Sequence, residues 1–352
     1  MSAAAMEPHD PPVLDVDRLR IEVRTPRGVA AAVEDASFSL RRGEALGLVG
    51  ESGSGKSIMM LALMGLLSDD SARVVAGRLR FLGEDLYGPG FASYRRELRG
   101  GAMAMIFQEP MTSLNPVLSI GRQIGDAIRA HAGGLAAGEA ERRAAALLRL
   151  VGVPEPERRL RQFPHEYSGG MRQRVMIAMA IANDPRVLIA DEPTTALDVT
   201  VQAQIMEALA QARAASGASL ILVTHDLGLI AETVDRIAVM YGGQIVETGG
   251  AAELFEQPRH PYTIGLMRSL PGVDRGRRRL YAIPGQPPAV NERPGGCVFH
   301  PRCEMRRGEA ICAQERPALR AVTATQAAAC HFADATPDWS RNLARSLAED
   351  GR

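Results

Sequence analysis

The stretch that decides the fold of this chain reads Gly50-Glu51-Ser52-Gly53-Ser54-Gly55-Lys56-Ser57. An apolar run at 45–49 precedes it and is typical of a buried strand, and the apolar run at 58–67 that follows is typical of a buried helix. A glycine-rich turn between such elements can point successive backbone N–H groups inward, and the positive end of the helix dipole attracts anions. The sequence therefore predicts a phosphate-binding loop.

Two side chains at the end of this loop have the chemistry that a nucleoside triphosphate requires. Lys56 is the only lysine in the chain, whose other basic residues are all arginine. A compact, flexible ammonium fits between phosphate oxygens where a planar guanidinium would crowd the loop. We expect Lys56 to reach the β- and γ-phosphates and Ser57 to offer its hydroxyl to Mg²⁺.

Composition limits the other classes of function. The formal net charge is +0 and only 4% of the residues are aromatic, so we expect no nucleic-acid partner. Residues 1–12 lack the pattern of a secretory signal, and the longest apolar run, at 58–67, is too short to span a membrane. We therefore expect a soluble protein of about two domains that reaches a membrane only through partners.

A polar residue is predicted at the end of one central strand of a doubly wound sheet. The apolar run at 102–107 predicts this strand, and Gln108 follows it directly. Because ligands lie beyond the carboxyl ends of such strands, we expect Gln108 to sense Mg²⁺ or an attacking water, with an ordinary loop glutamine as the alternative. The loop at 110–116, bounded by prolines, is a candidate surface for another protein. Residues 13–40 and 78–82 predict antiparallel strands beside the phosphate loop.

A helical insertion and a second helix start follow. Residues 120–160 have a largely helical pattern, which glycines and prolines interrupt. The helix that runs to about residue 182 begins after Ser168, a natural N-cap, with Gly169 and Gly170 in its first turn. Its first N–H groups would form a second anion site, unless this is a capped helix and nothing more.

Adjacent acids follow a buried strand at 187–190. Asp191 and Glu192 need a cation or an exposed cleft in such a place. We assign Asp191 to Mg²⁺ and Glu192 to the attacking water as its base, with one ion-paired and one solvated acid as the alternative. Asp198 precedes the next helix, where it is at least an N-cap. His225 ends a strand at 219–224 and can bond a γ-phosphate, unless it is a structural histidine.

Taken in order, these residues resemble the nucleotide-binding subunits of ABC transporters. The resemblance identifies 50–57 as the Walker A motif, Gln108 as the Q-loop, Ser168-Gly169-Gly170 as the signature, 187–192 as the Walker B motif with its catalytic glutamate, Asp198 as the D-loop and His225 as the switch histidine. The runs at 107–116, 191–200 and 260–263 are similar to those of the oligopeptide/dipeptide importer ATPases, a resemblance that extends to about Phe332.

The resemblance implies an ATPase with ATP and Mg²⁺ as cofactors. It implies that the signature helix completes the site of a second ATPase subunit, a paralogue or another copy, in a head-to-tail dimer. It further implies two transmembrane permeases docked near 108–115, an extracytoplasmic substrate-binding protein as an indirect partner, and a peripheral place on the cytoplasmic face of the inner membrane. Two alternatives stay open: a soluble ABC-type ATPase acting on nucleic acid or ribosomes, and an iron–sulfur redox sensor with a vestigial ATPase.

Two departures from the family pattern bear on the site. Tyr167 and Met171 stand in the signature where leucine and glutamine are commoner. Upstream of the phosphate loop, the region 28–30 has no aromatic ring that could stack on adenine. We therefore expect the base to pack more weakly or against aliphatic side chains.

All the cysteines lie in the C-terminal part of the chain: Cys297, Cys303, Cys312 and Cys330. Disulfides are not expected in a reducing cytoplasm, and the spacing lacks the short pair usual in structural zinc sites. Four thiolates could hold an iron–sulfur cluster, and the resemblance implies a [4Fe-4S] cluster at these positions. Zinc, helped by His300 or His331, and plain thiols are the alternatives.

The expected fold is α/β. It is a P-loop NTPase of the ABC type, with an antiparallel β subdomain, a helical subdomain and a small cysteine-containing C-terminal extension. The expected boundaries are a tail at 1–12, the nucleotide-binding domain at 13–270 with its helical subdomain at about 109–182, the extension at 271–335, and a tail at 336–352.

Overall fold

The computed structural model describes residues 11–89, 97–109, 113–195, 197–269, 281–305 and 308–337. Most of the two expected tails lies outside these residues, as do 110–112 of the candidate contact loop and the first part of the expected extension. Within the described ranges, no helix is long and apolar enough to cross a membrane.

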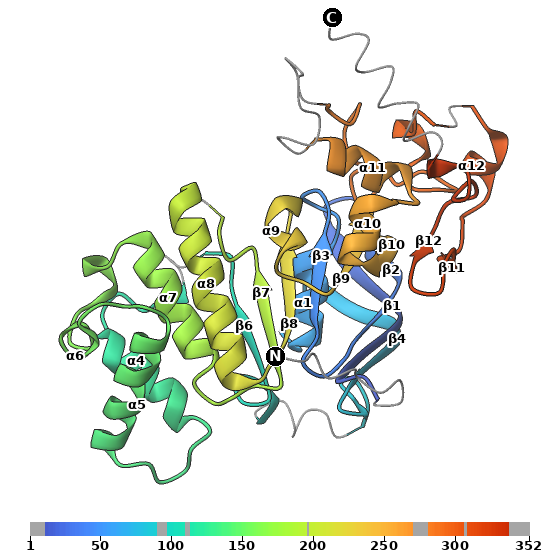
Figure 1. Cartoon of the computed structure of the whole chain (residues 1–352). Helices are drawn as coiled ribbons and strands as arrows, with labels where there is room; N and C mark the ends of the chain where they lie inside the picture. Colours follow the sequence, from blue (N-terminus) through green and yellow to red (C-terminus); the bar gives the residue numbers. More distant parts are fainter. Residues whose placement is uncertain are drawn as a thin grey trace, which may run out of the picture.

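An eight-stranded sheet forms the centre of the molecule (Figure 1). Its order is β11-β12-β10-β9-β3-β8-β7-β6. Strands β9, β3, β8, β7 and β6 are parallel, and β10 and the strands beyond it pair in antiparallel fashion. The strands are Ala45–Val49 (β3), Met103–Ile106 (β6), Val187–Asp191 (β7), Ser219–Thr224 (β8), Arg236–Tyr241 (β9), Gln244–Gly250 (β10), Arg320–Ala321 (β11) and Ala327–Ala328 (β12).

One expectation about this sheet is wrong. The strand predicted to be central, at 102–107, is β6, which lies at the edge of the sheet. Its residues are nevertheless mostly buried, because helix α7 (Gly169–Ala180) packs over it. An apolar run reports burial of the two faces of a strand and says little about how many neighbours the strand has.

Both faces of the sheet carry core, and this holds the phosphate loop in place. In β3, Ala45 and Val49 join the core that also contains helix α7, while Leu46 and Leu48 join the core on the other side of the sheet. Helix α1 (Lys56–Leu63) packs into that second core through Met59 and other side chains. The loop between β3 and α1 is therefore anchored at both ends.

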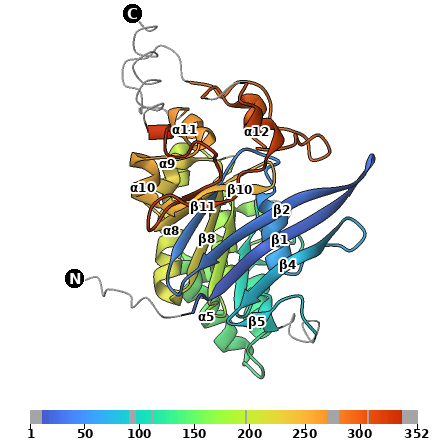
Figure 2. The ribbon, with the colours of Figure 1, turned by 90° about the vertical axis from the view of Figure 1, so that its right-hand side faces the viewer.

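A second, antiparallel sheet lies beside α1. Its order is β2-β1-β4-β5, and Figure 2 shows the long β1 and β2 projecting beyond the rest of the sheet. The strands are Leu14–Thr25 (β1), Gly28–Leu40 (β2), Ala72–Phe81 (β4) and Glu84–Asp85 (β5). The antiparallel strands expected in 13–40 are confirmed, and the strand expected at 78–82 is the end of the longer β4.

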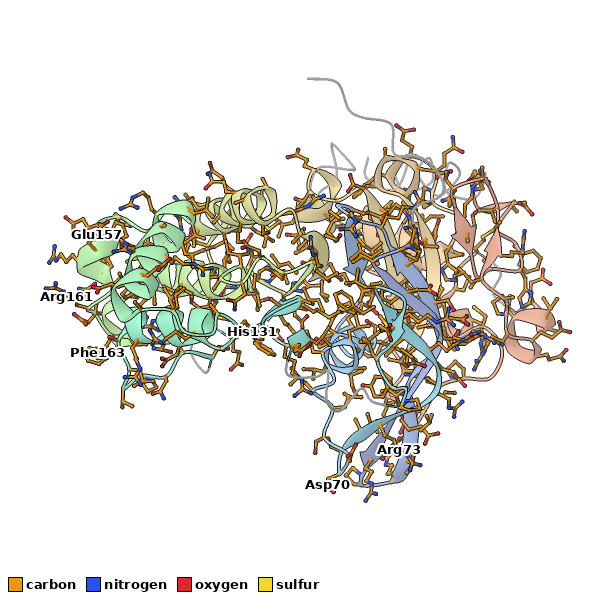
Figure 3. All side chains as sticks on the ribbon, turned by 90° about the horizontal axis from the view of Figure 1, so that it is seen from below. Asp70, Arg73, His131, Glu157, Arg161 and Phe163 are labelled. Atoms are coloured by element: carbon orange, nitrogen blue, oxygen red, sulfur yellow. The ribbon has the colours of Figure 1, made fainter. Side chains whose placement is uncertain are left out.

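The helical insertion is present on one side of the eight-stranded sheet, at the left in Figure 1. It consists of α4 (Ile120–Arg129), α5 (Ala137–Leu150), α6 (Pro156–Arg159) and α7, with a 3₁₀ turn at Pro164–Glu166. We call residues 120–180 the helical region. In Figure 3, Glu157, Arg161 and Phe163 mark its outer end, while His131 lies at its end nearest the sheet. Arg73 lies in β4 of the antiparallel sheet, and Asp70 lies in the turn before that strand.

The remaining helices connect the strands and lead to the C-terminal part. They are α8 (Val199–Ser216), α9 (Leu227–Ala231), α10 (Ala251–Glu256), α11 (Pro261–Arg268) and α12 (Ala310–Gln314), with a 3₁₀ turn at His300–Arg302. We call the described residues from 281 onward the C-terminal extension. It adds β12 to β10, and the Arg293 guanidinium donates to the Ala32 carbonyl in β2 at 2.7 Å. Figures 1 and 2 show it beside β10 and the antiparallel sheet.

Candidate functional site

The loop at 50–57 requires glycine at positions where the backbone turns tightly. Gly50 has a φ of 155°, and a Cβ there would lie 2.0 Å from the Met240 carbonyl oxygen. Gly55, the N-cap of α1, has a φ of 104°, and its Cβ would lie 2.8 Å from the Ala32 carbonyl oxygen. Only glycine fits both the left-handed backbone and the close neighbours.

Lys56 lies beneath this loop and is 5% exposed. Its ammonium donates to the carbonyls of Gly50 at 2.7 Å and Glu51 at 2.9 Å, and to the Ser54 hydroxyl at 3.3 Å. Burial lowers the pKa of Lys56, while the nearby carboxylates of Glu192, Asp191 and Glu51 act to raise it. A buried cation held inside a loop of N–H groups is suited to bind a phosphate.

Asp191 ends β7 next to Ser57 and fits a magnesium ion. Burial raises the pKa of Asp191, while the nearby Ser57 hydroxyl and the Lys56 cation act to lower it. The residue is 4% exposed, and its buried Oδ1 has no hydrogen-bond partner among the described residues. A buried carboxylate oxygen without a donor, close to the Ser57 hydroxyl, is the kind of ligand that Mg²⁺ takes.

The structure brings Glu192, Gln108 and His225 together. Glu192 Oε2 accepts a hydrogen bond from Gln108 Nε2 at 3.1 Å, and its Oε1 lies 3.4 Å from His225 Nδ1. The backbone of Glu192 is in the left-handed region, with a φ of 47°. Strain of this kind persists where the surroundings fix a residue and is common at active sites.

A cavity of about 700 Å³ lies over the loop and collects most of these groups. Lys56, Ser57, Gln108, Glu192 and His225 line it, together with loop residues Gly50, Ser52, Gly53 and Gly55. Its other walls include Val23, Ala32, Leu266 and Val290, and the described lining contains no Phe, Tyr or Trp. The base of a nucleotide bound here would therefore meet aliphatic side chains, in agreement with the missing ring at 28–30.

The signature residues lie apart from this cavity. Ser168 caps α7 by accepting a hydrogen bond from Met171 N at 3.3 Å, and Asp198 caps α8 by accepting one from Val201 N at 3.0 Å. Ser168, Gly169 and Asp198 are exposed, and none of them lines the cavity. Gly170 is half-buried because α8 packs against it: a Cβ there would lie 2.6 Å from a Val201 methyl group. Within one chain, these two helix ends therefore lie outside the lining of the cavity.

The four cysteines come together although they are far apart in sequence. Cys297, Cys303, Cys312 and Cys330 all line one cavity of about 20 Å³, next to His300 and His331. No disulfide joins them. Burial and the neighbouring cysteines raise the pKa of Cys297 to about 11 and that of Cys330 to about 12. In the described part of the chain, no group of three or more His, Cys, Asp and Glu is arranged to hold a metal ion, so the metal centre stays a prediction.

Sequence reasoning missed several residues that contact the site. The Thr195 hydroxyl donates to Glu192 Oε2 at 2.9 Å, and the Tyr262 hydroxyl accepts a hydrogen bond from Glu51 N at 2.8 Å. Arg302, from the C-terminal extension, pairs with the Glu51 carboxylate at 2.6 Å. Thr195 lies three residues after Glu192 and could have been suspected, but nothing in the sequence marks Arg302.

Comparisons with known proteins agree with this arrangement. A family model described as ABC transporter matches residues 33–195, and one described as oligopeptide/dipeptide transporter, C-terminal region, matches residues 246–312. Dipeptide transport ATP-binding protein DppD of Escherichia coli K12 is 48% identical over 320 residues, which cover 91% of this chain and 96% of that protein. A putative peptide import ATP-binding protein of Brucella abortus is 49% identical over 319 residues, covering 91% and 94%.

Solved structures are similar over the nucleotide-binding part. The dimeric structure of MJ0796, titled a bacterial ABC transporter cassette, has a TM-score of 0.58 and 25% identity, and covers 68% of this chain and 98% of that chain. CbiO1 from Clostridium perfringens, titled part of the ABC transporter complex cbiONQ, has a TM-score of 0.59 and 26% identity, with 70% and 92% covered.

A phosphate loop with its lysine, the carboxylate pair and the helical region together define an ABC-type ATPase, the class to which these solved cassettes belong. Its cofactors are ATP and Mg²⁺, as is typical of that class. At 48% identity over most of its length, the chain belongs to the family of ATP-binding subunits of dipeptide and peptide import systems. The predicted family and fold are confirmed.

Proposed function

We propose that this chain hydrolyses ATP to energise the import of di- or oligopeptides, or of a related small substrate, through a membrane permease complex. The names of its relatives in Escherichia coli and Brucella abortus support peptides as the cargo. The observation that carries the ATPase assignment is the contact of Glu192 with Gln108 and His225 in the cavity above Lys56.

The roles of the residues follow from this geometry. We assign the triphosphate to the N–H groups of 50–57 and to Lys56, and we assign Mg²⁺ to Ser57, Asp191 and Gln108. Bound Mg²⁺ would neutralise charge on the phosphate oxygens. Glu192 is aimed into the cavity by its hydrogen bonds and accepts the proton of the attacking water.

A head-to-tail dimer would complete each site. The exposed helix ends at Ser168 and Asp198 have N–H groups and side-chain caps. Neither residue lines the cavity over the phosphate loop of its own chain. Val199, beside Asp198, is an apolar side chain that is 81% exposed. We infer that the signature end of one subunit is placed on the triphosphate held by the other, and the dimeric form in the MJ0796 title belongs to a protein of the same fold.

An apolar groove supports permease docking. It has a volume of about 330 Å³ and lies between the sheet and the helical region, where Leu66, Met105, Phe107 and Met179 line it. Phe107 is 39% exposed and lies directly before Gln108. We assign this groove to a cytoplasmic segment of one permease subunit, so that the two ATPase subunits of a dimer would engage two permease subunits. This assignment puts the chain peripherally on the cytoplasmic face of the inner membrane. A substrate-binding protein would act outside, through the permeases.

We further propose that the C-terminal extension holds a [4Fe-4S] cluster on its four cysteines. Their convergence on one cavity supports a sulfur-ligated centre. The cavity has room for about one water-sized group, so a cluster would need the thiol side chains to move outward. Anaerobic purification with iron and zinc analysis tests this: about four irons per chain, lost in Cys303→Ser, is expected. Zinc alone, or no metal, would contradict it.

The division of the chain also belongs to this proposal. We retain a nucleotide-binding domain at 13–270, with its helical subdomain at about 109–182, and an extension at 271–335. The family models, which match 33–195 and 246–312, fall one on each of these two parts for most of their lengths.

Reconstitution tests the transport function. The chain is purified with candidate peptide permease subunits, placed in liposomes, and assayed for ATP-dependent uptake of a labelled dipeptide. We expect uptake that Lys56→Ala abolishes, because the loop then lacks its buried cation. Recovery of the chain with ribosomes or DNA instead of permeases would contradict the proposal and favour the soluble ATPase. Iron-dependent signalling without ATP turnover would favour the redox sensor.

A further inference from the structure

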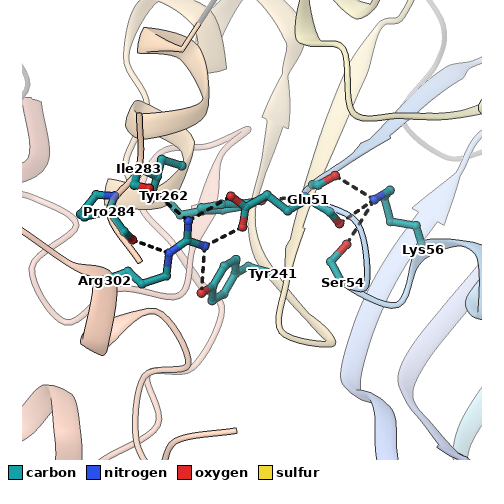
Figure 4. A network of polar contacts seen from close by, with 9 residues as sticks. Glu51, Ser54, Lys56, Tyr241, Tyr262, Ile283, Pro284 and Arg302 are labelled. Atoms are coloured by element: carbon teal, nitrogen blue, oxygen red, sulfur yellow. Dashed lines mark hydrogen bonds and ion pairs between the residues drawn. The ribbon is translucent and has the colours of Figure 1, made fainter. Parts of the chain in front are cut away.

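Arg302 reaches from the C-terminal extension into the phosphate loop (Figure 4). Its side chain is 6% exposed, and its two terminal nitrogens donate to the two carboxylate oxygens of Glu51 at 2.6 and 3.1 Å. Its Nε donates to the Pro284 carbonyl at 2.8 Å, and Nη1 donates to the Tyr241 hydroxyl at 3.3 Å. A bidentate guanidinium with this many acceptors is held in one orientation.

Glu51 is the second residue of the loop, so what fixes it also shapes the loop. Its backbone N–H donates to the Tyr262 hydroxyl at 2.8 Å, and its carbonyl accepts from Lys56 at 2.9 Å. The carboxylate is the third point of attachment, through Arg302. Figure 4 shows the carboxylate turned toward Arg302, on the opposite side from Lys56.

The negative charge of Glu51 makes its ion pair with Arg302 important for nucleotide binding. Glu51 lines the cavity, and its carboxylate already acts on Lys56 together with Asp191 and Glu192. A triphosphate adds further negative charge at the same place. An unpaired carboxylate in the loop would repel it, whereas one paired with a buried guanidinium does so far less.

We propose that Arg302 is a positioning residue of the ATP site. It neutralises Glu51 and holds the loop in the shape that receives the triphosphate, so the C-terminal extension is part of the nucleotide site. The inference rests on ATP binding to the loop at 50–57.

Other contacts attach the extension to the rest of the molecule without touching the loop. Arg316 pairs with Glu34 at 2.8 Å, and β12 pairs with β10. Loss of the Arg302 side chain should therefore leave the extension in place. Arg316→Met is the matched control, since it also removes an ion pair between the extension and the rest of the molecule.

The test measures the affinity of the purified full chain for MgATP. We expect Arg302→Met to weaken binding about tenfold, because it leaves the Glu51 charge unpaired. Adding Glu51→Gln to this variant removes the charge and should restore affinity to within about threefold of the wild type. Arg316→Met should bind normally. In the assembled complex, Arg302→Met should raise KM for ATP and leave kcat nearly unchanged.

Two results would overturn the inference: normal affinity in Arg302→Met, or no recovery when Glu51→Gln is added. Thermal unfolding reports whether Arg302→Met folds. If it does not, Arg302→Lys keeps the charge but loses the bidentate geometry, and it should bind ATP about threefold more weakly. Normal affinity in that variant would also overturn the inference. A wild-type chain that behaves like Lys56→Ala in the binding assay would refute ATP binding itself.

Discussion

Helices α1 and α7 begin in similar ways but lie in different surroundings. Each has glycine at its start and a serine nearby, and each can present free N–H groups to an anion. At the start of α1, Lys56 is buried and Ser57 lines the cavity, with the carboxylates of Asp191 and Glu192 close by. The start of α7 is exposed, and its cap Ser168 bonds only its own helix among the described contacts.

From this difference in surroundings we infer that the two helix starts have different roles. In the proposed function, the α1 start holds the phosphate tail and lies beside the groups that do chemistry. In the same proposal, the α7 start acts on a triphosphate that another subunit holds. Disruption of each start should therefore give a different defect, in binding and catalysis at α1 and in assembly-dependent turnover at α7.

The largest effect is expected at the α1 start from Glu192→Gln. Without a carboxylate to take the proton of water, ATP turnover should fall by about 10² to 10⁴. MgATP affinity should stay within about threefold, because the amide keeps the shape of the side chain. Steady-state ATPase and nucleotide-binding assays measure this, with the exposed Glu207→Gln as control. Turnover that survives would show that Glu192 is not the base.

The second prediction concerns the support that the phosphate loop at the α1 start receives from helix α11. Helix α11 carries Tyr262 to the loop, and the fully buried Glu247 accepts from the N–H groups of Arg259 at 2.6 Å and His260 at 2.9 Å just before it. Burial raises the pKa of Glu247 from 4.5 to about 7. Between these values the unfolded chain releases a proton that folded Glu247 keeps, so this contribution to the free energy of unfolding falls as pH rises.

Glu247→Gln does not titrate at this position and isolates the effect. The advantage of the wild type over Glu247→Gln should shrink by about 3 kcal/mol between pH 4.5 and pH 7. Urea unfolding at a series of pH values measures it, with the exposed Glu256→Gln as control. A difference that is constant with pH would show that folding does not shift the pKa of Glu247.

At the α7 start, Ser168→Ala should lower the ATP turnover of the assembled complex about tenfold, because the helix end loses its shape as an anion site. The affinity of the isolated chain for MgATP should not change. Ser119→Ala is the matched control, since Ser119 caps α4 through Arg122 N at the same 3.3 Å distance. Equal loss of turnover in both variants would mean that only helix stability is involved.

The smallest effect is expected from Tyr167→Phe, one residue before the cap. The Tyr167 hydroxyl donates to the Arg159 carbonyl at 3.0 Å, inside the helical region. Its loss should reduce the free energy of unfolding by about 1 kcal/mol and leave ATP affinity unchanged. Chemical denaturation measures the difference. A change in affinity would show that the α7 start influences the cavity of its own chain.

Much of the α1 side of this comparison could be predicted from the sequence. Gln108, Asp191 and His225 each end or follow an apolar run, and the runs are β6, β7 and β8, which are neighbours in the sheet. Residues at the same end of adjacent parallel strands must lie close together. Pattern and topology therefore place them in one site without any detail of packing.

The rest depends on long-range packing that leaves no periodic signal. Arg302 and Glu51 are 251 positions apart, and Arg302 lies in a short turn among many similar arginines. The edge position of β6 was missed because helix α7 buries it as fully as a neighbouring strand would. Strand β12 is two alanines long, too short for alternation to show.

That short strand has a consequence for the solubility of the whole protein. β12 covers the backbone of β10, where Ala329 N donates to the Val246 carbonyl at 2.8 Å and Gln326 bonds the Glu247 carboxylate at 2.8 Å. A chain cut short after α11 would leave these backbone groups of β10 unpaired in water, beside the apolar side chains of Ile245 and Val246. We expect such a fragment to retain the phosphate loop but to self-associate through the uncovered strand. The C-terminal residues would then protect the protein from aggregation.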